Sequence, residues 1–223
     1  MIKVEKLSKK FKQKTIFDDI NCSLATGKSY AIVGKSGAGK TTFLNILSGL
    51  EAPTSGKVMI DDITVNAKNQ KKLYRDYCGF IFQNFGLIDT ETVKQNLDLG
   101  FANQKLSRAE KEAKMKAVLS HLGLDYLDSK QKIYTLSGGE QQRIALARII
   151  LKKPQVIFAD EPTGSLDAEN GKVVLHSLLN DFGSDATVII ATHAQEVWQQ
   201  CDYVITIENK QIQLRENNNV SSC

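Results

Sequence analysis

Gly34-Lys35-Ser36-Gly37-Ala38-Gly39-Lys40-Thr41 is the stretch that decides the fold of this chain. Two glycines frame four residues, and a lysine and a threonine follow, which is the pattern of a phosphate-binding loop. The sequence before it predicts a buried strand over 29–33, and the sequence after it predicts a helix over 41–48 that Gly49 ends.

A strand, a loop and a helix in this order form an anion site. Glycines let the loop wind so that its backbone N–H groups point at phosphate oxygens, at the positive end of the helix. We expect Lys40 to reach the β- and γ-phosphates and Thr41 to hold Mg²⁺. A glycine-rich turn without a ligand is the plain alternative, but the complete pattern predicts that the chain binds a nucleoside triphosphate.

The bulk properties are those of an ordinary soluble domain. The 223 residues allow one large domain, or a core with a small subdomain, and the net charge of +4 makes no case for nucleic acid. No apolar run approaches the ~18 residues of a membrane span, and no signal-peptide pattern opens the chain. The four cysteines have neither metal-ligand nor disulfide-framework spacing, which is typical of a reducing cytosol.

Strand and helix patterns alternate along most of the chain. Residues 2–24 predict two or three antiparallel strands with a turn at 12–14. Further strands or hairpins are expected at 56–65, 78–82, 156–159, 187–191 and 203–214. The polar residues 216–223 are expected to form a disordered tail.

Residues 89–131 interrupt this alternation with a purely helical pattern. The segment from Ser107 to Glu110 has the spacing of a capping box, and Gly123 is expected to end the helix. We expect Ala113, Ala117 and Leu122 to form its buried face. The order of elements therefore predicts a parallel α/β sheet that carries a small helical subdomain.

Asp160 and Glu161 directly follow the strand predicted over 156–159. A carboxylate at the C-terminal end of a strand, beside a phosphate loop, suits Mg²⁺ held through water. Glu161 would then be placed to orient or deprotonate an attacking water. A polar strand end before the Pro162 turn is the alternative, and the neighbouring phosphate loop favours the metal site.

Leu136-Ser137-Gly138-Gly139-Glu140 is the second informative stretch. Ser137 and Glu140 have capping-box spacing, so a helix start alone could explain them. The two glycines cost backbone entropy and offer nothing to packing, which favours an exposed helix start that closely approaches an anion. With Gln141-Gln142-Arg143, the stretch resembles the signature motif of the ABC ATPase family, in which the motif of one subunit closes over the γ-phosphate bound to the other.

This resemblance extends over residues 1–215 and implies that the chain binds ATP and Mg²⁺. Phe11 matches the family's adenine-stacking aromatic position, where a ring face suffices. Without the family, Phe11 would be read as a core strand residue. The residues expected to bind ATP are Phe11, Gly34, Lys35, Ser36, Gly37, Ala38, Gly39, Lys40, Thr41 and Thr42.

The resemblance also implies the remaining roles. The catalytic residues are Lys40, Glu161 and His193, with His193 as the γ-phosphate sensor, and the metal residues are Thr41, Gln83 and Asp160. Ser137 to Glu140 would contact the ATP of the partner copy, and Asp167, in Ser165-Leu166-Asp167, would lie where the chain crosses between subunits. Taken alone, Gln83 and His193 would be read as polar strand ends.

Glu140 departs from the family pattern, which commonly has Gln at that position. A carboxylate there places negative charge near the partner's phosphates, unless it is turned away into the helix cap. We expect this difference to tune activity and not to abolish it.

The fold that the resemblance implies is a P-loop NTPase (RecA-like) core with a parallel sheet, an N-terminal antiparallel β subdomain and an inserted α-helical subdomain. The single ABC ATPase domain would span 1–215. Its nucleotide-binding core with the β subdomain would take 1–88 and 136–215, and the helical subdomain 89–135.

The expected function is that of a nucleotide-binding subunit that forms an ATP-sandwiched homodimer. It would sit in the cytoplasm on the inner face of the cell membrane and power a separate multi-span permease, which would dock near residues 84–99. The stretch 85–97 resembles the macrolide-exporter and lipoprotein-release branch, and most closely the bacteriocin or peptide export group.

Two other readings stay open. The same ATPase could drive a membrane protein that relays a mechanical signal or activates cell-wall enzymes without moving cargo. A soluble ABC ATPase of DNA repair or translation is the second, although such proteins usually carry a coiled-coil insertion, zinc motifs or tandem nucleotide domains, which the sequence lacks.

Overall fold

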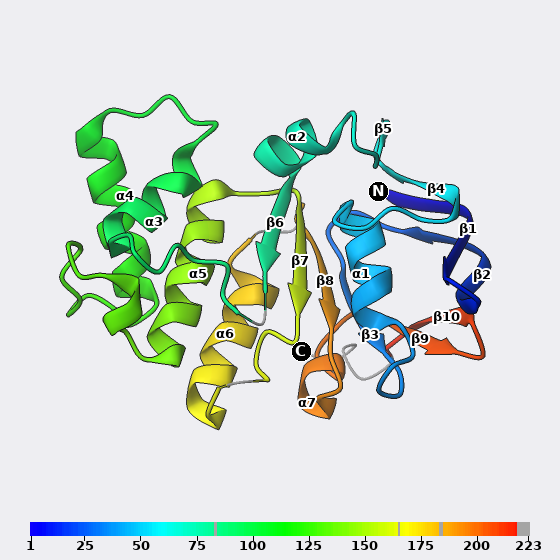
Figure 1. The fold of residues 1–223 in the computed structure, drawn as a ribbon. Coiled ribbons are helices and arrows are strands. Elements are labelled where there is room, and N and C mark those ends of the chain that lie inside the picture. Colours follow the sequence, from blue (N-terminus) through cyan, green and yellow to red (C-terminus); the bar gives the residue numbers. More distant parts are fainter. Residues whose placement is uncertain (83, 165, 183–184, 218–223) are drawn as a thin grey trace.

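A six-stranded sheet forms the centre of the molecule (Figure 1). The computed structural model describes residues 1–82, 84–164, 166–182 and 185–217. The strand order is β10-β9-β3-β8-β7-β6, and all neighbours are parallel except the antiparallel pair β9 and β10. The strands are β3 (Ser29–Val33), β6 (Cys78–Ile81), β7 (Val156–Asp160), β8 (Thr187–Ala191), β9 (Tyr203–Glu208) and β10 (Gln211–Glu216).

Ten helical segments surround the sheet in the described part of the chain. They are α1 (Lys40–Ser48), α2 (Gln70–Lys72), the π-turn η1 (Leu73–Tyr77), α3 (Val93–Asp98), η2 (Leu99–Phe101), α4 (Arg108–His121), η3 (Ile133–Thr135), α5 (Gly138–Lys152), α6 (Ala168–Asn180) and α7 (Gln195–Trp198). The helix predicted after the phosphate loop is α1, and Gly49 ends it in a left-handed conformation with φ 79°.

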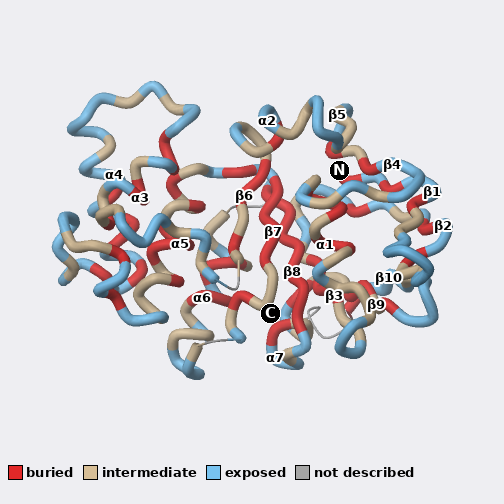
Figure 2. The backbone as a smooth tube through the Cα atoms, viewed as in Figure 1, coloured by how far each residue is buried: buried red, intermediate tan, exposed pale blue. Residues whose placement is uncertain are grey.

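The two faces of the sheet belong to two different hydrophobic clusters, because side chains alternate along each strand. On β7, Ile157 and Ala159 face the cluster that contains α5, α6 and α7, whereas Val156 and Phe158 face the cluster that contains α1. The buried segments in Figure 2 accordingly run through β6, β7 and β8 at the middle of the molecule. The sheet is therefore covered on both sides, as a parallel sheet requires.

A second, antiparallel sheet lies beyond α1, with the strand order β2-β1-β4-β5. Its strands are β1 (Ile2–Phe11), β2 (Lys14–Leu24), β4 (Ser55–Ile60) and β5 (Ile63–Thr64). The main sheet reaches it through the last hairpin, since Asp18 N–H donates to Lys210 O at 3.2 Å and Gln211 Nε2 donates to Asp18 O at 2.7 Å. Both the antiparallel subdomain and its strand boundaries follow the sequence prediction closely.

The helical insertion at the opposite end of the molecule contains α3, η2 and α4 (Figure 1). The capping box of Ser107 and Glu110 begins α4 as predicted. The predicted buried face is wrong at two positions, because Ala113 and Ala117 are exposed and the face that packs contains Met115, Val118, Leu119 and Leu122. The larger side chains fill the space against the core, and the two alanines serve as helix formers on the solvent side.

The end of the described chain corrects the predicted tail. Glu216 belongs to β10, and Asn217 is only 8% exposed. The Asn217 side-chain amide donates to the carbonyl oxygens of Trp198, Gln199 and Cys201 at 2.9, 3.2 and 2.9 Å. The polar side chain therefore closes the end of α7, and the rest of the predicted tail, 218–223, lies outside the described residues.

Within the parts of the chain that the structure covers, every helix is too short or too polar to traverse a lipid bilayer.

Candidate functional site

Three separate stretches of the sequence meet at the carboxyl ends of the central strands. The phosphate loop follows β3, Asp160 and Glu161 stand at the end of β7, and Thr192 and His193 follow β8. Because β3, β8 and β7 are neighbours in the sheet, their C-terminal ends share one edge. Ligands of open α/β sheets bind in the crevice at this edge.

The phosphate loop has the backbone that its glycines predict. Gly37 and Gly39 have φ of 75° and 106°, in the region that favours glycine. A Cβ on Gly39 would lie 2.6 Å from Ile16 Cγ2 and 2.8 Å from Phe17 Cζ, so β2 packs directly against the loop. Lys40 Nζ donates to Gly34 O at 3.2 Å, which folds the lysine back across the loop. The lysine ammonium group thus stays beside the loop backbone, where a bound phosphate would meet it.

Thr41 and Asp160 join the loop to β7. The Thr41 hydroxyl donates to Asp160 Oδ1 at 3.1 Å. Burial raises the pKa of Asp160 above its ordinary value, and the Thr41 hydrogen bond acts in the opposite direction. A hydroxyl and a half-buried carboxylate in contact are the hard oxygen donors that suit Mg²⁺. The two predicted metal residues therefore fit the ion, whereas Gln83, the third, lies outside the described residues.

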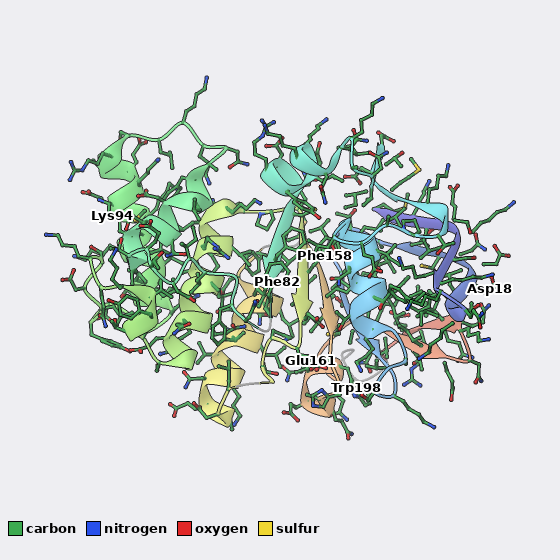
Figure 3. All side chains as sticks on the ribbon, in the orientation of Figure 1. Asp18, Phe82, Lys94, Phe158, Glu161 and Trp198 are labelled. Carbon is green, nitrogen blue, oxygen red and sulfur yellow. The ribbon has the colours of Figure 1, made fainter. Side chains whose placement is uncertain are left out.

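Glu161 lies at the end of β7 (Figure 3), and the segment after β8 holds its side chain. His193 Nδ1 lies 2.8 Å from Glu161 Oε1, and the Thr192 hydroxyl donates to Glu161 Oε2 at 3.2 Å. Since the carboxylate accepts, Nδ1 is the donor, and the other ring nitrogen has no hydrogen-bond partner among the described residues. The Glu161 side chain is 19% exposed and that of His193 is 72% exposed. This is a carboxylate fixed by two donors next to an accessible imidazole, an arrangement suited to handling a proton from water.

Phe11 lies at the end of β1 and is 46% exposed, so it is not the core residue of the alternative reading. Lys9 Nζ lies 4.7 Å from the centre of the Phe11 ring, and Lys9 also pairs with Glu51 at 2.8 Å. The ammonium group covers one face of the ring. Phe11 belongs to the same hairpin whose β2 strand packs on Gly39, so the hairpin connects this ring to the phosphate loop.

The signature stretch begins α5. Ser137 and Glu140 form the capping box that their spacing predicts. Ser137 N–H and Oγ both donate to Glu140 Oε2 at 2.7 Å, and Glu140 N–H donates to Ser137 Oγ at 3.3 Å. The Tyr126 hydroxyl donates to Glu140 Oε1 at 2.7 Å. Tyr126 first, and then Ser137, hold the pKa of Glu140 below its ordinary value. Among the described residues, no hydrogen bond connects this stretch to the phosphate loop of the same chain.

Asp167 caps α6 within its own chain. Its Oδ1 accepts from the N–H groups of Glu169 and Asn170 at 3.1 and 3.0 Å, and Asn170 Nδ2 donates to its other oxygen at 2.5 Å. Arg143 on α5 donates to the Asn170 side chain, and a Cβ on Gly139 would lie 3.0 Å from Asn170 Cγ. The segment predicted to cross between subunits is thereby fixed to the start of α5, while Ser165 lies outside the described residues.

Three residues at these sites carry contacts that the sequence did not predict: Thr192, Tyr126 and Asn170. Thr192 could have been found from its place next to His193 at a strand end. Tyr126 and Asn170 gave no signal, because each is distant in sequence from the group that it contacts.

The comparisons with known proteins agree with this geometry. The family model of the ABC transporter matches residues 17–164. The ABC transporter ATP-binding protein YclH of Bacillus subtilis (strain 168), itself uncharacterized, is 34% identical over 210 residues, which are 93% of this chain and 92% of that protein.

Macrolide exporters are further relatives. The macrolide export ATP-binding/permease protein MacB of Brucella abortus (strain 2308) is 38% identical over 201 residues, which are 88% of this chain and 31% of that protein. The chain thus spans about a third of the length of such relatives.

Solved structures show the same architecture over the whole chain. The dimeric ATP-binding cassette MJ0796 in a post-hydrolysis state, bound to ADP and Pi, superposes with a TM-score of 0.85 at 29% identity, covering 100% of both chains. A second dimeric structure of MJ0796 gives 0.85 at 30% identity. The match of the family model, the full-length relative and the shared edge of β3, β7 and β8 lead to one conclusion: this chain belongs to the ABC transporter family and is an ATP-binding ATPase subunit of it.

Proposed function

We propose that two copies of this chain close head to tail around two ATP molecules and that this closure drives a separate membrane permease. Each ATP would be bound by the phosphate loop of one copy and by the signature residues Ser137 to Glu140 of the other. Contacts with the γ-phosphate would shift the equilibrium between open and closed pairs toward the closed pair. Hydrolysis would remove these contacts, and the pair would reopen. The observation that carries the proposal is the assembly of the phosphate loop, Asp160 and Glu161 at one sheet edge.

The hydrolysis step requires a base, a charge clamp and an anchored nucleotide. Glu161 would take a proton from the attacking water while the water oxygen bonds to the γ-phosphorus. At the same time the bond between the γ-phosphorus and the β–γ bridging oxygen would break, so that ADP leaves. His193 and Thr192 fix the Glu161 carboxylate and so orient it. Lys40 would leave Gly34 O to stabilise charge on the phosphate oxygens. Mg²⁺, when held by Thr41 and Asp160, would add positive charge at the same oxygens.

Dimer formation explains why the signature stretch does not contact the phosphate loop of its own chain. Ser137 and Glu140 cap the N-terminus of α5, whose positive end would face the phosphates bound to the partner copy. The dimeric MJ0796 structures, which superpose over the whole length of this chain, support a paired arrangement. In that arrangement Asp167, capped next to α5, would lie at the subunit boundary.

The permease would dock where the helical subdomain meets the main domain. A cavity of about 400 Å³ lies between η1 and η2, and its lining includes Lys71, Arg75 and Leu99. Leu99 is 47% exposed and Ile88, earlier in the same stretch, is 46% exposed. Basic and apolar groups together suit a short cytoplasmic helix of a membrane protein. MacB, whose name joins an ATP-binding part to a permease, supports such a partner.

The cargo that we propose is an exported peptide or bacteriocin, an antibiotic or a lipoprotein. The similarity to macrolide export proteins supports the export direction. The resemblance of residues 85–97 to the peptide export group supports a peptide as the first candidate. The permease would determine the cargo, since the nucleotide site itself contacts none of it.

The Glu161→Gln variant tests the proposal. It keeps the shape of the side chain but removes the base, so turnover should fall by roughly 10²–10⁴-fold while ATP binding persists. The variant should elute as a dimer on size-exclusion chromatography with Mg-ATP and as a monomer without it. Glu216→Gln, an exposed carboxylate on β10, serves as the control and should turn over normally.

The same tagged variant identifies the partner. The variant is affinity-purified in the presence of Mg-ATP from detergent-solubilised cells of its source. A multi-span membrane protein should co-purify with it in a stoichiometric amount. An extracytoplasmic domain in that protein without a transport path would favour mechanical signalling over export. Recovery of ribosomal or DNA-bound proteins alone, or near-normal turnover of Glu161→Gln, would contradict the proposal.

A further inference from the structure

We propose that Tyr126 is a positioning residue for the signature serine Ser137 and that it acts through the Glu140 carboxylate. This inference rests on the proposed function, because Ser137 would act on ATP only when two chains have closed. Tyr126 is not part of the signature stretch. It lies in the loop between α4 and η3, so its contact with Glu140 is a tertiary one.

Within the described parts of the single chain, three donors reach the Glu140 carboxylate. Ser137 N–H and Ser137 Oγ donate to one oxygen at 2.7 Å, and Tyr126 Oη donates to the other at 2.7 Å. Tyr126 is 64% exposed, so its ring contributes little to the core. Among the hydrogen bonds of the described residues, the one that this side chain makes is the contact of its hydroxyl with Glu140.

The Ser137 hydroxyl has only one proton to donate. In the single chain that proton is engaged with Glu140. To donate this proton to a γ-phosphate on the partner copy, the Ser137 hydroxyl must break its hydrogen bond to the Glu140 carboxylate. Glu140 then keeps two donors, the backbone N–H of Ser137 and the hydroxyl of Tyr126.

The position of Glu140 matters because its charge lies close to the place where the partner's phosphates would bind. Held in the cap, the carboxylate lies at the positive end of α5, which offsets its charge. Released from the cap, it would approach the phosphates and oppose closure. The two remaining donors keep the carboxylate in the cap at the moment when Ser137 leaves.

Tyr126 therefore contributes more to the closed pair than to the single chain. With Phe at 126, Glu140 still has both Ser137 donors in the open state, but only the backbone N–H in the closed state. A group shifts an equilibrium only by its differential interaction with the two states. The loss of Tyr126 should thus penalise closure and spare the folded, ATP-bound single chain.

The test measures ATP-driven dimerisation in the Glu161→Gln background, where the closed pair does not turn over. Tyr126→Phe should raise the ATP concentration for half-maximal dimer formation about threefold to tenfold, the effect of one ordinary, solvent-accessible hydrogen bond. Light scattering after size-exclusion chromatography gives the dimer fraction. Tyr134→Phe is the matched control, because Tyr134 is 66% exposed and its hydroxyl makes no hydrogen bond in the described part of the chain.

Three further measurements separate positioning from a structural role. Tyr126→Phe should leave the melting temperature unchanged, as well as the affinity of dilute single chains for a fluorescent ATP analogue. With Glu140→Gln in the same background, closure should need less ATP, because the repulsion is gone. Tyr126→Phe should then have no further effect.

An unchanged ATP requirement in Tyr126→Phe, or an equal increase with Gln at 140, would overturn the inference. If the Glu161→Gln chain forms no dimer at any ATP concentration, the proposed function fails and the inference fails with it. If that chain dimerises but is indifferent to Tyr126, only the inference fails.

Discussion

Glu161 has a backbone conformation that few residues with side chains adopt, with φ of 45°. Such a conformation costs on the order of 1–3 kcal/mol and persists only where its surroundings hold it. The Glu161 N–H donates to Ala191 O at 2.9 Å, and its carboxylate meets Thr192 and His193. The strand β8 and the residues after it thus fix both ends of this residue. The sequence could indicate the carboxylate, but not the turn that aims it.

Three cysteines should resist alkylation because burial keeps them as thiols: Cys78 and Cys201 are buried, and Cys22 is half-buried. Burial raises the pKa of Cys22, Cys78 and Cys201 to about 12 each. The thiolate is the reactive form, so at pH 8 only roughly 10⁻⁴ of each thiol is reactive, against about a quarter for a free cysteine. Peptide mass spectrometry after iodoacetamide treatment gives the rate for each site.

The pH profile provides the sharper check on these cysteines. Since the pKa is raised, the rate in the folded protein should keep increasing about tenfold per pH unit up to pH 10. In denaturant the same sites should level off near pH 9. A plateau near pH 9 in the folded protein would show that burial does not control these thiols.

Among the elements, the phosphate loop offers a comparison of two glycines in one turn. Both Gly37 and Gly39 have positive φ, but a Cβ on Gly37 meets nothing within 4 Å, whereas one on Gly39 collides with β2. Gly39→Ala should therefore lower the free energy of unfolding by about 1–3 kcal/mol more than Gly37→Ala does. Urea unfolding of the two variants measures the difference. Equal losses would mean that β2 can move away from the loop.

Two of the described helices begin with a capping box made of Ser and Glu, and comparing them separates the effect of a helix cap from that of the signature motif. Ser107 and Glu110 begin α4, and Ser137 and Glu140 begin α5. Replacing either serine by alanine should lower the free energy of unfolding by about 1 kcal/mol. Only Ser137→Ala should also reduce ATP hydrolysis, because only that hydroxyl would meet the partner's phosphate. Equal ATPase rates in both variants would show that Ser137 acts only as a helix cap and has no role in hydrolysis.

The elements whose patterns are local were predictable, and the contacts between distant elements were not. The phosphate loop, the strand before Asp160 and both capping boxes follow from spacing within a few residues. The predicted buried face of α4 was wrong at Ala113 and Ala117. The pattern within a helix does not reveal which of its sides will pack against the core. Tyr126 reaches Glu140 and Asn217 closes α7 only through the tertiary fold.

At the scale of the whole molecule, the permease surface can be tested with two exposed leucines at opposite ends. Leu99 is 47% exposed beside the cavity at η2, and Leu214 is 39% exposed on β10. Leu99→Asp should abolish co-purification of the membrane partner, because a charge there would be buried in the interface. ATP-driven dimerisation should persist in both variants. Loss of the partner in Leu214→Asp, with Leu99→Asp unaffected, would place docking at the other end.

The strand that carries the phosphate loop has neighbours from the far end of the chain. Ser29 is opposite Val188 on β8, and Tyr30 is opposite Tyr203 on β9. While a ribosome is still adding the residues before β8, β3 therefore has no partner in its own sheet, and such distant pairings form slowly. In a nascent chain, the phosphate loop would therefore leave the ribosome before the neighbouring strands β8 and β9 have been synthesised. We therefore expect the protein to bind ATP only late in its synthesis, and we expect the apolar strand to need shielding by chaperones until then.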